Sequence, residues 1–104
     1  MNSFTVQQLG LMAHAVGLAN TRRQSPRAWK KLRSLEACYR NYFLTGADSS
    51  DFAELQKLAA AGMMTERKID SQLTGFASFV FCVTVEGFAQ LQAFGMAPPA
   101  TGRA

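Results

Sequence analysis

The fold is decided by two stretches of sequence, which read LQKLAAAGMM at residues 55–64 and FVFCVTVEG at residues 79–87. The first predicts a helix that ends at Gly62, because glycine readily takes the left-handed conformation that closes a helix. The second carries large apolar side chains at alternate positions, which predicts a strand ending before Thr84. Threonine is a preferred N-cap, so a further helix is expected to begin directly after it.

The residues between these stretches predict a β-hairpin. Residues 64–68 favour a short edge strand, whose basic residues discourage pairing with another chain. Residues 76–83 favour the main strand, with one face turned to the core through Ala77, Phe79, Phe81 and Val83. The loop is expected at Asp70-Ser71-Gln72 and Gly75, with Phe76 near its tip.

Helices are predicted on both sides of the hairpin. The earlier one spans 51–61, and its apolar stripe consists of Phe52, Leu55, Leu58 and Ala59. Its N-cap stays open among Asp48, Ser49 and Ser50. The later helix spans 85–94, ends at Gly95 and carries Phe88, Leu91 and Phe94 inward.

Two more helices are predicted in the N-terminal half. Thr5 and Gln8 have the spacing of a capping box, which predicts a helix over 6–16 that ends at Gly17. Residues 17–24 are expected to form a polar, basic connection. Ser25-Pro26 then favours the start of an amphipathic basic helix over 26–38, with a continuation through residues 42–43 left open. One face of that helix would be apolar, formed by Trp29, Leu32, Leu35 and Tyr39.

This order predicts a small α+β domain of winged-helix character, with three helices followed by a β-hairpin and a C-terminal helix. A chain of 104 residues buries enough surface for one core, so residues 1–95 are expected to form a single domain. Residues 96–104, with Pro98-Pro99, are expected to be a disordered tail.

Composition favours a cytoplasmic protein without a cofactor. The N-terminus lacks the charged start and apolar run of a signal peptide, and no apolar run reaches the about 20 residues of a membrane helix. Cys38 and Cys82 are the two cysteines and form no paired motif, so we expect free thiols. With a single histidine as well, the sequence predicts neither a metal site nor a bound cofactor.

The charge of the chain is concentrated in one segment. Residues 22–40 hold seven of the eleven basic residues and one acidic residue, Glu36, so they carry +6 while the whole chain carries +4. Such a concentration favours a polyanionic partner or an acidic protein surface. The candidate binding residues are Arg22, Arg23, Arg27, Lys30, Lys31, Arg33, Arg40 and Asn41.

Alternatives stay open for these residues. Trp29, Tyr39 and Tyr42 interleave with the cations and suit base stacking or an interface anchor, but the first two suit the core equally well. Arg40 and Asn41 have the chemistry to contact nucleic acid. Alternatively, Arg40 pairs with a carboxylate and Asn41 caps a helix end.

Catalysis is not expected. His14 is the only histidine, and it falls near a predicted helix end, where interaction with backbone carbonyls explains it. The acids Asp48, Asp51 and Glu54 fall at a helix start, where the helix dipole favours them. No nucleophile elbow or phosphate-binding loop occurs in the sequence, so we predict that the protein is not an enzyme.

Three blocks resemble a family of short phage and prophage accessory proteins with the pattern HALGL…YRNHF…AGLM…FxVTxxG. Here they read HAVGL at 14–18, YRNYF at 39–43, and AGMM at 61–64 followed by FCVTVEG at 81–87. The similarity covers about residues 5–92. The chain departs from the pattern at Tyr42, where the family tends to have histidine, and by a longer basic insert at about 20–37. The resemblance implies a phage accessory protein and supplies no catalytic residues.

Three functional hypotheses follow. The first is a phage-encoded inhibitor or adaptor, of the anti-CRISPR type for example, that binds a host or defence protein through the basic helix. Its partner would present an acidic or a nucleic-acid-binding surface. The second is a DNA-binding winged-helix regulator, which is disfavoured because the helix before the hairpin is rather acidic. The third is a homodimeric structural module.

Overall fold

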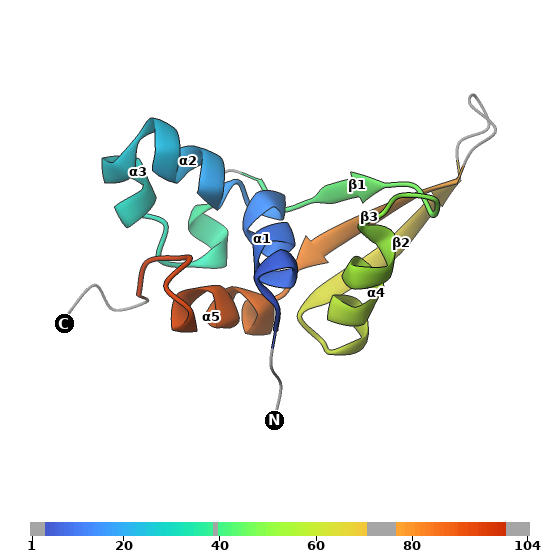
Figure 1. Ribbon diagram of the computed structural model, residues 1–104. Coiled ribbons are helices and arrows are strands. Elements are labelled where there is room, and N and C mark those ends of the chain that lie inside the picture. Colours follow the sequence, from blue (N-terminus) through green and yellow to red (C-terminus); the bar gives the residue numbers. More distant parts are fainter. Residues whose placement is uncertain (1–3, 39, 71–76, 100–104) are drawn as a thin grey trace.

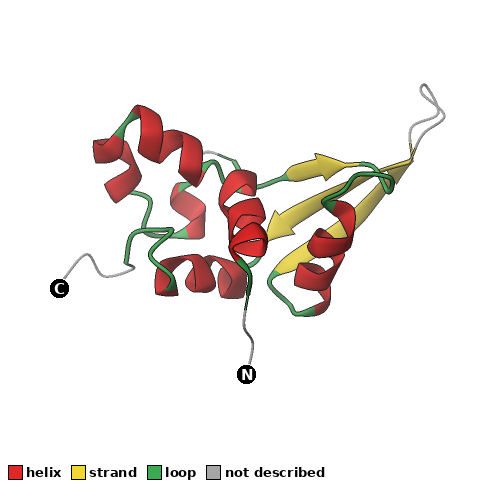
Figure 2. Cartoon of the chain, in the orientation of Figure 1, coloured by secondary structure: helices red, strands yellow, loops and turns green. Residues whose placement is uncertain are grey.

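The structure is a computed structural model, and it describes residues 4–38, 40–70 and 77–99 (Figure 1). Within these residues the elements follow in the order α1 (Val6–Ala15), α2 (Leu18–Gln24), α3 (Pro26–Lys30), the 3-10 helix η1 (Leu35–Ala37), β1 (Phe43–Thr45), α4 (Phe52–Ala60), β2 (Met64–Asp70), β3 (Ala77–Val83) and α5 (Val85–Ala93). The fold is therefore α+β, as the sequence predicts (Figure 2).

The sheet is antiparallel and has the strand order β1-β3-β2. β2 is an edge strand, which confirms the prediction for 64–68, although the strand continues to Asp70. β1 was not predicted, because it is only three residues long and carries no pattern of its own. It exists through its pairing with β3, in which Phe43 lies opposite Phe81. The expected two-stranded hairpin is thus part of a three-stranded sheet.

The core lies around α1, which packs against α5, α4 and β3 at the centre of the molecule (Figure 1). The largest fully buried side chains come from all of these elements and from the start of α2: Phe81, Met12, Leu18, Leu55, Leu58, Leu91 and Val16.

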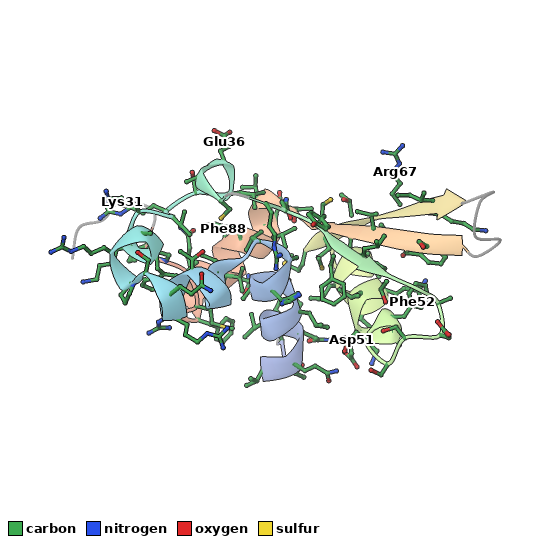
Figure 3. All side chains as sticks on the ribbon, turned by 90° about the horizontal axis from the view of Figure 1, so that it is seen from above. Lys31, Glu36, Asp51, Phe52, Arg67 and Phe88 are labelled. Atoms are coloured by element: carbon green, nitrogen blue, oxygen red, sulfur yellow. The ribbon has the colours of Figure 1, made fainter. Side chains whose placement is uncertain are left out.

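α4 covers one face of the sheet. The Phe52 ring lies 4.8 Å from the Phe79 ring and 6.0 Å from the Phe81 ring, measured between centroids. Arg67 points away from the α4 side (Figure 3). By register and alternation, Leu44 and Ile69 share the face of Arg67, and they are 58% and 41% exposed. The two faces of the sheet therefore differ, one packed and one open.

Three of the predicted caps are confirmed, but the N-cap of α4 is Asp51 and not Asp48, Ser49 or Ser50, because the Ser49 hydroxyl accepts from the Asp51 amide before the helix begins. Thr5 and Gln8 form the capping box of α1. Gly62 has a φ of 82° after α4, and the next residue, Met63, is buried. The Thr84 hydroxyl accepts a hydrogen bond from the Gly87 amide at 3.1 Å, so it caps α5. These helix ends are specified by hydrogen bonds between residues close in sequence, so they can be predicted from the sequence.

Two predictions for the basic region are wrong. Residues 17–24 are not a connection, because Gly17, with a φ of 76°, turns the chain directly into α2. The helix over 26–38 is not formed either, because α3 ends at Lys30 and the chain is extended at Ser34. Arg27 and Lys31 stand four residues apart, and like charges at this spacing disfavour a longer helix. Leu32 and Leu35 still pack against the core, but from turns and η1 rather than from one helix face.

The C-terminal part differs from the prediction at Phe94 and at the first residues of the tail. Phe94 was predicted to point inward, but it is 53% exposed because it lies beyond the last turn of α5. Gly95 has a φ of 74° and reverses the chain there, which brings Met96 against the core and buries Ala97. The predicted tail thus begins with packed residues, and 100–104 lie outside the described residues.

Some predictions cannot be compared with the structure. The hairpin loop at 71–75, Phe76 and Tyr39 lie outside the described residues. None of the helices in the described ranges combines the length and hydrophobicity that a membrane crossing requires.

Candidate functional site

Six of the predicted binding residues lie on two consecutive helices and the turn after them. Arg22 and Arg23 belong to the last turn of α2, Arg27 and Lys30 belong to α3, and Lys31 and Arg33 follow. All six are exposed. We call them the basic surface: Arg22, Arg23, Arg27, Lys30, Lys31 and Arg33. α2 and α3 pack against each other, so two helices present these cations in place of the predicted single one.

Local interactions explain why these two short helices form. Cations in the last turn of a helix interact favourably with the negative end of its dipole. The Ser25 hydroxyl accepts a hydrogen bond from the Ala28 amide at 3.4 Å, and Pro26 takes the first position of α3. The Arg33 Nε donates to the Lys30 carbonyl at 3.2 Å, so this guanidinium caps the end of α3. Part of the charge therefore stabilises the helices that carry it.

Other contacts anchor the basic surface to the core. The Arg22 guanidinium lies 4.7 Å from the centroid of the Trp29 ring, which joins α2 to α3. The Gln92 Nε2 donates to the Arg33 carbonyl at 2.8 Å and links α5 to the turn after α3. Trp29 and Leu32, which lie between these cations in the sequence, pack against the core. The basic surface is thus a folded part of the domain.

A cavity of about 310 Å³ opens beside the basic surface. Its walls come from four parts of the chain and are Ala13, Leu18, Arg22, Arg23, Trp29 and Met96. We call it the α1–α3 hollow. Met96 was not predicted to take part, although the position after a closing glycine often packs back over the helix end. Met63 packs in the same way after Gly62, so the signal for Met96 is present in the sequence.

The other two predicted binding residues, Arg40 and Asn41, are not part of the basic surface and contact α1 and β3. The Arg40 Nη2 donates to the His14 carbonyl at 2.7 Å, at the end of α1. The Asn41 Nδ2 donates to the Val83 carbonyl at 2.9 Å, and its Oδ1 accepts from the Val83 amide at 2.7 Å. Asn41 therefore pairs with β3 as a strand residue would, just before β1 begins.

The residues that carry the family resemblance meet in the same region. His14 is exposed, and its ring lies edge-on to Phe43 with 5.3 Å between centroids. The Thr84 hydroxyl donates to the Gly62 carbonyl at 2.7 Å. The ring contact of His14 and the hydrogen bond of Arg40 join the end of α1 to the start of β1. The hydrogen bonds of Asn41 and Thr84 join the same region to the end of β3 and to the turn after α4. All of these contacts join parts of the chain that are distant in sequence.

Among the described residues, two other titratable groups have shifted pKa values. Lys57, and then Gln8, hold the pKa of Glu54 below its usual value by hydrogen bonding. Burial raises the pKa of the Cys38 thiol. Among the described residues, no group of three or more histidine, cysteine or acidic side chains is placed to hold a metal ion.

Comparison of the chain with protein-family models, with curated proteins and with solved structures gives no match. The basic surface and its surroundings are therefore the candidate functional site.

Proposed function

We propose that this protein is a non-enzymatic binding protein and that its basic surface contacts a protein partner. The partner presents either acidic side chains or a surface that normally holds nucleic acid, since both complement clustered cations. We further propose a winged-helix character for the domain, in which α4, β2 and β3 are the scaffold and α2 and α3 are the part that binds.

One observation carries this proposal: six exposed cations lie together on α2, α3 and the following turn, and no acidic residue precedes Glu36 in the chain. A cluster of charges of one sign steers oppositely charged partners and raises their association rate.

The arrangement argues against reading of DNA by α4 and the hairpin. In a winged-helix regulator, the helix before the hairpin would lie on the DNA, yet α4 carries a single cation, Lys57. Its Nζ lies 3.1 Å from Glu54 Oε1, so it already has an acidic partner. α2 and α3 lie at the opposite end of the molecule from the β2–β3 tip (Figure 1). The cations of α2 and α3 are therefore separate from the hairpin.

The resemblance to phage accessory proteins suggests the kind of partner. A phage protein of this size without catalytic groups commonly acts by occupying a surface of a host or defence protein. An inhibitor of the anti-CRISPR type is the specific form of this proposal, with the basic surface covering or replacing a charged contact of the target.

The test is capture of partners by the intact protein from host lysate treated with nuclease. The charge-reversed variant Arg27→Glu/Lys30→Glu is compared with a matched control, Arg67→Glu/Lys68→Glu, which reverses two cations on β2. We expect the first variant to lose a partner that wild type and control both retain. Equal recovery by all three proteins would refute a role for the basic surface.

A DNA titration separates the alternative function. Random duplex DNA is titrated at two salt concentrations, because binding through phosphates weakens steeply as salt rises. We expect no duplex binding that depends on α4 or the hairpin. Tight, salt-sensitive DNA binding that Arg67→Glu/Lys68→Glu abolishes would favour the DNA-binding regulator instead.

A further inference from the structure

The α1–α3 hollow combines apolar walls with positive charge. Ala13, Leu18 and Met96 give it apolar walls, and Arg22 and Arg23 place two cations in the same lining. We infer that the hollow is an anchor site for an acidic peptide segment of the partner. One large apolar side chain of that segment would enter the hollow while flanking carboxylates meet the arginines. This inference rests on the proposed function and specifies the chemistry of the partner.

The hollow is large enough to admit one large apolar side chain. Its volume of about 310 Å³ lies at the lower limit of the about 300–1,000 Å³ typical of small-molecule pockets. Interfaces draw most of their affinity from a few anchors that fill such pockets near clustered charges. A leucine or an aromatic side chain is therefore the expected occupant.

Trp29 forms the aromatic part of the wall. Its indole nitrogen is buried and has no hydrogen-bond partner among the described residues, so its resonance is sensitive to a change in packing around the hollow.

The same residue argues for a peptide over a nucleic acid. Base stacking requires an open aromatic face. The Arg22 guanidinium lies over the Trp29 ring at 4.7 Å, and the ring also packs against the core. The apolar walls likewise offer nothing to a phosphate. A side-chain anchor with neighbouring carboxylates uses every group of the lining.

The experiment uses the intact protein and three defined probes. The first is a hexapeptide with one leucine among glutamates, the second replaces that leucine with alanine, and the third is a short DNA duplex. The chain has one tryptophan, so its indole N–H resonance and its fluorescence report on the hollow without labelling of other sites. Arg22→Gln/Arg23→Gln tests the arginines, and Arg67→Gln/Lys68→Gln is the control with the same charge change.

We expect the leucine peptide to shift the indole resonance and to bind about tenfold more tightly than the alanine peptide, because several methylene groups become buried. Arg22→Gln/Arg23→Gln should weaken it by a further tenfold or so, and the control should not. If both peptides bind equally and the indole resonance stays unchanged, the hollow is not the anchor, although the proposed basic surface stands. If only the duplex binds, or if nothing binds at millimolar peptide, the inference is overturned.

Discussion

Gly87→Ala offers the sharpest test of how the end of β3, the turn after α4 and the start of α5 are packed. Gly87 lies in the first turn of α5, and a Cβ there would overlap the Met63 carbonyl oxygen and lie 3.0 Å from Val83 Cγ1. That carbonyl accepts a hydrogen bond from the Thr84 amide at 2.9 Å, so moving it also disturbs the start of α5.

The magnitude follows from three contributions. Forcing an extra carbon into a packed site costs about 1–3 kcal/mol. Weakening the Thr84 hydrogen bond adds about 1 kcal/mol. The better helix propensity of alanine offsets up to about 1 kcal/mol. We therefore expect a net loss near 2 kcal/mol in the free energy of unfolding, which lowers Tm by about 10 °C for a domain of this size.

Gly10→Ala is the matched control, since Gly10 lies inside α1 and a Cβ there meets no atom within 4 Å. That variant should gain about 0.5–1 kcal/mol because glycine is a poor helix former. Urea unfolding followed by circular dichroism, together with thermal melts, measures both variants. The packing described for α5 would be refuted by a Gly87→Ala protein that is as stable as wild type, provided that Gly10→Ala shows its expected gain.

Three further predictions concern single contacts. Asn41→Ala should cost about 2 kcal/mol in urea unfolding, because both of its hydrogen bonds to Val83 are lost; a loss below about 0.5 kcal/mol would contradict that role. Thr84→Ala should cost about 1–2 kcal/mol through loss of the α5 cap, and Thr84→Ser should restore most of it. The pKa of Glu54 is lowered in the folded state, chiefly by its hydrogen bond with Lys57. The stabilisation of the fold by ionised Glu54 is therefore fully present above the pKa of this carboxyl in the unfolded chain, and it disappears as pH falls through the folded-state pKa. Wild type should therefore exceed Glu54→Gln in stability at neutral pH and converge with it in acid, as melts across that pH range would measure.

Features set by neighbouring residues were predictable from the sequence. The capping box at Thr5, the closing glycines and the Thr84 cap depend on groups within a few residues of each other. The edge strand at β2 and the buried positions of β3 follow from alternation, and Phe81 and Val83 are indeed buried.

Features set by distant contacts were not predictable. β1 depends on β3, which lies almost forty residues later, and on Asn41 binding Val83. The periodic apolar residues at 29, 32 and 35 predicted one helix, but the core takes them from α3, a turn and η1. Among the candidate binding residues, six cations lie together on α2, α3 and the following turn. Only the fold reveals the hollow beside them, because its walls come from separate parts of the chain.

The central claim is that the basic surface holds the partner, and the dissociation constant of the captured, purified partner tests it most directly. Isothermal titration at one fixed salt concentration compares wild type, Arg27→Glu/Lys30→Glu and the control Arg67→Glu/Lys68→Glu. We predict that the first variant binds at least about tenfold more weakly, which corresponds to about 1.4 kcal/mol. The control should match wild type within about threefold. Equal affinity of all three proteins, or a larger loss in the control, would contradict the claim.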